Sequence, residues 1–268
     1  MFNRIAHKDG LVIYQSSLLS GTGVVHAFST RVGGVSVGPY ASLNLGLSMY
    51  PQGDSSNNIE VNYRRFTSVL GCEDRIPTEV YQVHGNAVWL PPTDKSDLTP
   101  EADAIVSDQP GRLLIIRTAD CCPVLIASRD GTAVAGIHAG WRGIVGGVVP
   151  KAIGCFKDKF GTEANDLVAG IGPSIGRNYY EVGPEVVKAF IDADLEEAVH
   201  DRPGGKPQID LKDAAKRQLM QCGIGEEAID CCDLCTYDDS QSFFSYRRDN
   251  KRTGKMANVI GVKMKVCP

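Results

Sequence analysis

Three short apolar segments follow one another between residues 112 and 138 and limit what this chain can form. They read RLLIIRT, PVLIAS and TAVAGIH, separated only by Ala-Asp-Cys-Cys and Arg-Asp-Gly. Apolar runs of this length, bounded by turn residues, are typical of strands that are buried on both faces. We therefore predict three neighbouring strands of one largely buried sheet, with Cys121 and His138 at strand ends.

The remaining elements are predicted from apolar periodicity and from capping residues. Helices are expected at residues 59–70, 144–160, 184–194 and 211–222, the last capped by Asp210. Further strands are expected at 79–90, 167–171, 228–236 and 256–262, and alternation in the first places Gln82 and His84 on one face. Helices and strands intersperse without strict alternation, which favours an α+β fold of mixed sheets flanked by helices over a doubly wound one.

Composition narrows the class of protein. Of 268 residues, 43% are hydrophobic and no linker-like segment interrupts them, so we expect one catalytic domain over residues 1–268. The net charge of -4 argues against a nucleic-acid binder, because a phosphate backbone demands a basic surface. We find no signal peptide or membrane-spanning run. A cytoplasmic location and reduced thiols among the nine cysteines are therefore expected.

Two of the five histidines lie in glycine-rich polar contexts, and a thiol lies between them in sequence. His84 occurs in Gln-Val-His-Gly, His138 opens His-Ala-Gly-Trp-Arg-Gly, and Cys121 ends Thr-Ala-Asp-Cys. Two imidazoles and one thiolate could hold a tetrahedral zinc with an open fourth position. The same atoms could also form a cysteine nucleophile with a histidine base, so both interpretations stay open at this point.

A longer series of motifs resembles one known family. The segments are Ala27–Arg31 with Gly33–Ser36, Leu43–Gly46, Gln82–Gly85, Thr118–Cys121, His138–Gly143, Gly172–Ile175 and Phe244–Arg248. In this order they resemble the purine nucleoside phosphorylase family once called the laccase-domain or multicopper polyphenol oxidase family. Some of its members are described as peptidoglycan editing factors.

The resemblance implies a layered α+β fold like that of the cytotoxic necrotising factor catalytic domain. It also implies a zinc ion on His84, Cys121 and His138, and phosphorolysis of adenosine, inosine, guanosine and methylthioadenosine together with adenosine deamination. The small-molecule partners would be a purine nucleoside and phosphate. A trinuclear copper cluster would need more histidines than the three left over, so only copper in the same three-ligand site remains as a less favoured alternative to zinc.

Other side chains are candidates for contacts with the substrates. Arg31 could orient phosphate through its paired donors, while Asn44, Gln82 and Arg142 are candidates for binding the nucleoside. Asp120 could orient an imidazole or simply cap a strand. The basic run at residues 247–255 is interpreted as a solvated surface segment, from which one of its paired arginines could reach the active site.

Two alternative functions remain at this point. In one, Cys121 is the nucleophile and His138 the base of a cysteine hydrolase or an editing enzyme for cell-wall precursors. In the other, the chain is a nucleotide-binding module with a structural metal, which the open ligand set argues against. Neither the preferred base nor the oligomeric state follows from the sequence, nor does a role for Cys231, Cys232 and Cys235.

Overall fold

The computed structural model describes residues 1–46, 53–93 and 99–263, and its strands form two large sheets and a two-stranded ribbon. In sheet order, the first sheet contains β1 (Phe2–Ala6), β2 (Val12–Ser16), β3 (Val25–Ser29), β14 (Met256–Gly261), β7 (Arg112–Thr118) and β4 (Ile76–Glu79). The second contains β13 (Ile229–Cys231), β10 (Leu167–Ile171), β8 (Cys122–Ser128), β9 (Val134–Ala139), β6 (Ala104–Ser107) and β5 (Val88–Trp89). The ribbon pairs β11 (Val199–His200) with β12 (Gln208–Ile209).

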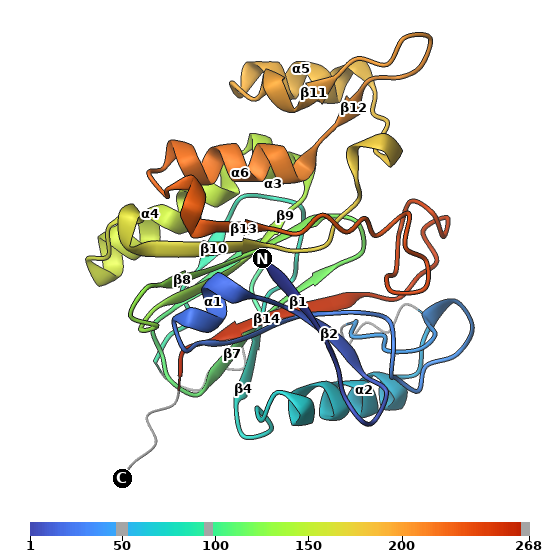
Figure 1. Ribbon diagram of the computed structural model, residues 1–268, viewed down its shortest axis with the longest axis vertical. Helices are drawn as coiled ribbons and strands as arrows, with labels where there is room; N and C mark the ends of the chain where they lie inside the picture. The colour runs from blue at the N-terminus through green and yellow to red at the C-terminus, as the bar shows by residue number, and fades with distance from the viewer. Residues whose placement is uncertain (47–52, 94–98, 264–268) are drawn as a thin grey trace.

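Helices lie on the outer faces of these sheets and at one end of the molecule (Figure 1), and the short helix Ser17–Gly21 contacts strands of both sheets. The helices are α1 (Ser17–Gly21), α2 (Ser56–Val69), α3 (Trp141–Val145), α4 (Val148–Phe160), α5 (Pro184–Asp192) and α6 (Leu211–Gln221). Short 3-10 helices cover Gly38–Tyr40, Ala164–Asp166, Arg177–Tyr179, Glu196–Ala198 and Glu226–Ala228. Mixed pairing, with both parallel and antiparallel neighbours in each large sheet, confirms the predicted α+β class.

The two large sheets pack face to face, and the position of β7 between the second sheet and α2 explains why residues 113–116 are all apolar. Leu114 and Ile116 point into the core shared with the second sheet, while Leu113 and Ile115 point into a second core under α2. The sheets approach closely at Gly136 of β9, where an added Cβ would lie 3.0 Å from Ile116 Cγ1. Both faces of β7 are thus buried, as expected for a strand without polar alternation.

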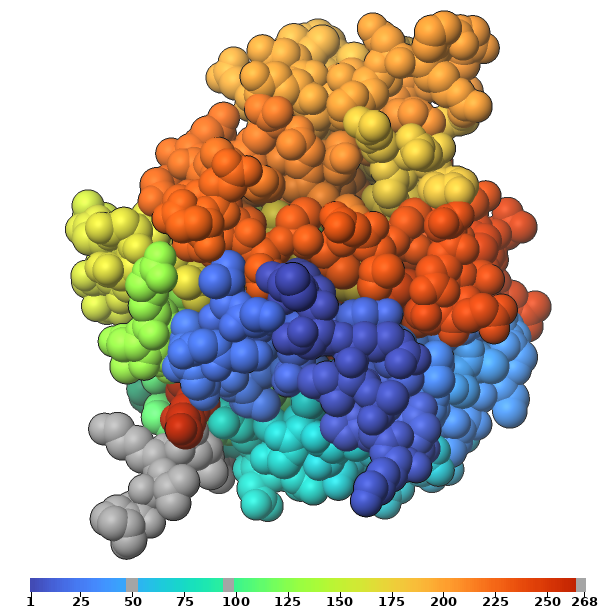
Figure 2. Space-filling model, in the orientation of Figure 1, coloured from blue at the N-terminus to red at the C-terminus, as the bar shows by residue number. Residues whose placement is uncertain are grey.

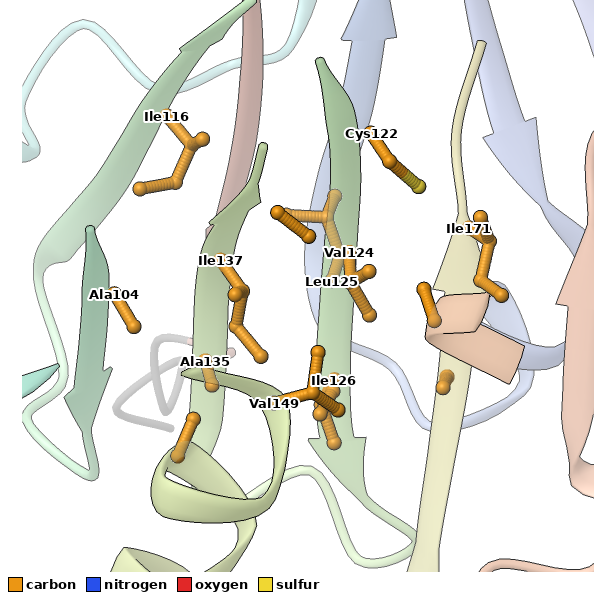
Figure 3. Close-up of a cluster of buried hydrophobic side chains, with 14 of the residues drawn as sticks. Ala104, Ile116, Cys122, Val124, Leu125, Ile126, Ala135, Ile137, Val149 and Ile171 are labelled. Atoms are coloured by element: carbon orange, nitrogen blue, oxygen red, sulfur yellow. The ribbon is translucent and has the colours of Figure 1, made fainter. Parts of the chain in front are cut away.

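The opposite face of the second sheet is covered by α3, α4 and α6 (Figure 1). Figure 3 shows Val149 of α4 close to Ile126 and Ala135 of the sheet, with Ile137 nearby. The order of layers is therefore α2, first sheet, second sheet, and the group of α3, α4 and α6. This arrangement agrees with the predicted flanking of mixed sheets by helices.

Several predicted elements are confirmed at nearly their expected bounds. The strands at 112–118 and 167–171 match β7 and β10, and the helix at 59–70 matches most of α2. Asp210 caps α6 as predicted, because its carboxylate accepts hydrogen bonds from the main-chain N–H groups of Lys212 and Asp213.

Other predictions were wrong, each for a local reason. The three apolar segments do not form one sheet: β8 and β9 are neighbours, but β7 belongs to the other sheet, and residues 119–121 cross between the two. The helix expected at 144–160 is two helices, since Gly146 ends α3 and Gly147 adopts a left-handed φ of 76°. Residues 79–90 and 228–236 are strands only over β4, β5 and β13, with loops in between.

The segment from α5 to β12 forms one end of the molecule, as the orange atoms in Figure 2 show. None of the helices in the described ranges has the length and apolar character needed to cross a membrane.

Candidate metal and active site

Three predicted ligands come together where β8 begins and β9 ends, in the middle of the second sheet. His84 comes from the loop between β4 and β5, Cys121 from the crossing between β7 and β8, and His138 from β9. One ligand atom from each lies within 4.8 Å of the other two. The two imidazole rings meet edge to face, with centroids 4.8 Å apart and an interplanar angle of 79°. Residues up to 54 positions apart in sequence therefore present nitrogen, sulfur and nitrogen to a common point.

The loop that carries His84 is not the strand that alternation predicted. His84 has a left-handed φ of 59°, a conformation in which histidine is enriched relative to most non-glycine residues. The main-chain N–H groups of Val83, His84 and Gly85 all donate to the carboxylate of Asp103, at 3.3, 3.0 and 2.6 Å. Consecutive N–H groups that converge on one anion fix the turn and hence the direction of the imidazole.

Asp103 also orients the second histidine. Its Oδ1 lies 2.7 Å from Nδ1 of His138, and the Asp103 side chain is fully buried. A carboxylate on Nδ1 leaves Nε2 of His138 as the ring nitrogen available toward Cys121 or a metal. We did not predict this residue from the sequence. An acidic residue directly before the buried apolar strand β6 is the signal that could have identified it.

Electrostatics in the site favour a charged carboxylate and a thiolate. Burial acts to raise the pKa of Asp103, but hydrogen bonds from His138 and from the main chain hold it below the ordinary value. Burial also opposes ionisation of Cys121, yet the adjacent His138 and His84 lower the pKa of its thiol to about 6. The thiolate form is the one that binds metals and acts as a nucleophile.

Gly140 shows that the three ligands surround a space of atomic size. A Cβ built on Gly140 would lie 3.2 Å from Cδ2 of His84, 3.3 Å from Sγ of Cys121 and 3.7 Å from Cε1 of His138. Because Gly140 has no side chain, the space between His84, Cys121 and His138, which we call the cradle, stays free. Two imidazoles and a thiolate form a borderline-soft donor set that suits zinc, so these residues fit such an ion.

Gln82 and Asn44, predicted to bind the nucleoside, are engaged within the protein. The Gln82 amide donates to the carbonyl of Arg117 and accepts from its N–H, both at 2.8 Å, which joins the His84 loop to β7. Asn44 is 3% exposed; its Nδ2 donates to Asp54, and its Oδ1 accepts from the N–H of Lys255. Both side chains brace the loops around the site.

Arg31 and Arg142 differ in their contacts with the rest of the protein. Arg31 donates from Nε to the carbonyl of Ala41 and from Nη1 to that of Ser240, and its guanidinium lies 4.6 Å from the Phe244 ring centroid. Arg142 is exposed and covers the ring of Trp141 at 4.3 Å. That face of the indole is therefore occupied by Arg142.

Asp120 does not hold an imidazole. It adopts a φ of 95°, and its carboxylate accepts from the hydroxyl of Thr236 and from the N–H of Arg247, each at 2.7 Å. This ties the basic segment to the wall of the site beside Cys121. Of the paired arginines, Arg247 faces Tyr180 at 5.1 Å, whereas Arg248 binds carbonyl oxygens and Asp249.

The other histidines and cysteines of the described ranges lie outside the cradle. Among the described residues, His84, Cys121 and His138 are the only group of three or more histidines, cysteines and carboxylates placed to hold a metal ion. Cys231, Cys232 and Cys235 are free, and Sγ of Cys235 accepts a hydrogen bond from Gly176 N–H. A multinuclear copper centre has no counterpart in the described ranges.

Comparison with known proteins identifies the family. A family model described as multi-copper polyphenol oxidoreductase laccase matches residues 25–263. The chain belongs to this laccase-like family. Proteins named purine nucleoside phosphorylase YfiH from Shigella flexneri and Escherichia coli K12 are each 41% identical over 239 residues, 89% of this chain and 93% of the relative. These matches confirm the resemblance seen in the motifs.

Solved structures of similar proteins share the laccase-like fold over its whole length. YlmD from Geobacillus stearothermophilus gives a TM-score of 0.88 at 29% identity, covering 97% of this chain and 99% of that one. A protein from Neisseria meningitidis gives 0.79 at 32% identity, covering 98% and 99%. The fold similarity to cytotoxic necrotising factor stays a prediction.

Proposed function

We propose that this protein is a zinc-dependent purine nucleoside phosphorylase acting on adenosine, inosine, guanosine and methylthioadenosine, which also deaminates adenosine. The cradle of His84, Cys121 and His138 carries the proposal, because it offers three protein ligands among the described residues, whereas a closed structural site would have four. The name shared by relatives that cover most of the chain supports the phosphorolytic reaction.

In this proposal the protein holds the metal through residues that are already oriented. Zinc would supply a Lewis acid at the open side of the cradle. Asp103 keeps His138 in the tautomer that presents Nε2 and holds the His84 loop in place. Copper could occupy the same donors, since it competes well for nitrogen and sulfur, but zinc suits a reaction without electron transfer.

The two reactions have simple atomic balances. In phosphorolysis a phosphate oxygen forms a bond to C1′ of the ribose, the C1′–N9 bond breaks, and its electron pair leaves with the purine, which takes up a proton. In deamination water replaces the amino group at C6, and ammonia leaves. Neither reaction changes the oxidation state of the protein.

We assign supporting roles to the other candidate residues from their contacts. Arg142 is exposed beside the cradle, and we propose that it contacts the nucleoside. Hydrogen bonds within the protein already occupy donors or acceptors of Arg31, Asn44 and Gln82. We therefore propose that these three residues shape the substrate-binding loops. Their effect on phosphate or nucleoside binding would then be indirect.

We also propose that residues 1–268 act as one catalytic domain, since the ligands come from both the first-sheet crossing and the second sheet. The partners are small molecules, a purine nucleoside and phosphate. A cytoplasmic location would suit the free cysteines of the described ranges.

The deciding experiment is phosphate-dependent release of free base from each nucleoside by the purified protein, with metal content measured by elemental analysis. We expect about one zinc per chain and loss of base release in His84→Ala, Cys121→Ala and His138→Ala. Phosphate-dependent base release at the wild-type rate in all three variants would refute the proposal.

A second candidate function is a cysteine hydrolase or editing enzyme for cell-wall precursors. The observation in its favour is that Sγ of Cys121 lies within 4.8 Å of a ring nitrogen of His138, an arrangement suited to a nucleophile and its base. The same histidine helps to lower the pKa of the thiol. A metal-free protein that retains activity and loses it on alkylation of Cys121 would favour this function over the first.

A further inference from the structure

Two basic residues, Lys255 and Arg247, lie beside the crossing that carries Asp120 and Cys121. Lys255 immediately precedes Met256 of β14, which pairs with Thr118 of β7 just before the Asp120 and Cys121 crossing. The N–H of Arg247 binds Asp120 at 2.7 Å, which brings the start of the basic segment to the same crossing. Lys255 and Arg247, from the C-terminal part of the chain, therefore lie on either side of the crossing at residues 119–121.

Lys255 is a half-buried lysine whose ammonium group has no hydrogen-bond acceptor within the described residues. This ammonium lies 5.3 Å from the centre of the Tyr246 ring. Burial lowers the pKa of this ammonium, while the charges of Cys121 and Asp120 act in the opposite direction. A half-buried ammonium without an acceptor is a strong candidate for a ligand contact.

Arg247 also keeps donors free. Only Nη1 has an acceptor among the described residues, the carbonyl of Glu181 at 3.1 Å, and the guanidinium lies 5.1 Å from the Tyr180 ring centroid. The neighbouring Arg248 is the contrast, because its donors are used on Asp249 and on three carbonyl oxygens. The contact with Tyr180 and the hydrogen bond to Glu181 hold the guanidinium of Arg247 and leave Nε and Nη2 for a ligand.

Asp120 is the carboxylate at this wall, and its oxygens are occupied. They accept from the Thr236 hydroxyl and the Arg247 N–H, so they position the basic segment. Lys255, Arg247 and the exposed Arg142 lie near two negative charges, the Asp120 carboxylate and the Cys121 thiolate, whereas Asp103 is paired with His138. The wall therefore offers a net positive potential beside the cradle, which suits a small multivalent anion.

We propose that Lys255 and Arg247 form an oxyanion subsite beside the metal cradle and that it takes inorganic phosphate, the second substrate. This inference rests on the proposed phosphorolytic function for the identity of the anion. Arg31 fits that role less well, because Nε and Nη1 already serve carbonyl oxygens. The subsite would hold phosphate on the same side as Cys121, next to the open face at Gly140.

The test measures binding of inorganic phosphate to the metal-loaded protein by calorimetry, with no nucleoside present. We expect Lys255→Met and Arg247→Gln each to weaken phosphate binding about tenfold or more, as loss of a charge-assisted contact should. Lys255→Arg should recover part of that loss. In turnover experiments the same variants should raise KM for phosphate while KM for the nucleoside and the metal content stay within about twofold of wild type.

The matched control is Arg252→Gln, which removes an exposed cation from the same segment and should leave phosphate affinity unchanged. Phosphate affinity within twofold of wild type in both subsite variants would overturn the proposal, as would wild-type protein that binds no phosphate. Arg247 is exposed, so its variant carries the test if Lys255→Met does not fold. Phosphate binding without base release would leave the subsite standing and refute phosphorolysis instead.

Discussion

The carboxylate of Asp103 lies 2.7 Å from Nδ1 of His138 and also accepts the main-chain N–H of His84 at 3.0 Å. One buried residue therefore orients two of the three residues of the cradle, contacting the imidazole of His138 and the main-chain N–H of His84. The arrangement makes the cradle rigid before any ion is bound, which reduces the cost of ordering its ligands.

Asp103→Asn should weaken zinc binding about 10-fold to 100-fold, the usual effect of removing a partner of a metal-ligating histidine. The amide keeps one acceptor but loses the negative charge that fixes His138. Competition with a chromogenic chelator measures the affinity directly. Asp130→Asn is the control, since Asp130 binds Ser128 and Thr132 in a distant turn, and an equal loss there would contradict the assignment.

Cys121→Ala should abolish stabilisation of the fold by zinc. A ligand that binds only the folded state at about 100 times its Kd adds about 2.7 kcal/mol to the free energy of unfolding. Chemical denaturation with and without zinc should show this increment in wild type and lose it in the variant. Cys155→Ala, in α4, should keep it; an unchanged zinc effect in Cys121→Ala would place the metal elsewhere.

Gly140→Ala should block the cradle by steric overlap. The new Cβ would lie 3.2 Å from His84 and 3.3 Å from Cys121, whereas the φ of -72° at Gly140 suits alanine without backbone strain. We expect less than one metal ion per chain by elemental analysis, with a folded far-ultraviolet spectrum.

Gly154→Ala is the matched control, because Gly154 lies within α4 with nothing within 4 Å of the added Cβ. It should retain its metal and gain about 0.5–1 kcal/mol in the free energy of unfolding. Normal metal content in Gly140→Ala would show that the cradle is wider than the geometry indicates.

Stability should fall with acid because of His26. This ring is 1% exposed and accepts the N–H of Ser16 at 3.0 Å, and burial lowers its pKa from the ordinary value of 6.5 to about 4. The unfolded chain takes up a proton below about pH 6.5 while the folded one does not, so the contribution is complete above that pH. It is lost progressively as the pH falls toward about 4.

For His26 alone we expect the free energy of unfolding to drop by about 2 kcal/mol between pH 7 and 5. Urea denaturation of the metal-free protein at both pH values measures this drop. His26→Gln keeps an acceptor for Ser16 but does not titrate, so its pH dependence should be smaller by that amount. Equal pH dependence in the two proteins would refute the role of His26.

Local features of the chain were sufficient to predict individual elements. The apolar run of β7, the cap at Asp210 and the stripe of α2 each depend on neighbours within a few residues, which is the range over which periodicity and capping act. The grouping of His84, Cys121 and His138 was also predicted, because they lie in unusual glycine-rich contexts and in a recognisable series of motifs. Their role as metal ligands stays a prediction.

Tertiary structure alone decided how these pieces meet. A strand buried on both faces has the same apolar sequence in either sheet, so the placement of β7 opposite β9 depends on packing at Gly136 and Ile116. Asp103 could not be chosen over Asp120 from the sequence, since both stand beside apolar strands and only three-dimensional distance separates them. The three residues of the cradle could be chosen from the sequence because residue type and neighbouring motif are local properties. Their orientation depends on contacts between segments far apart in the chain.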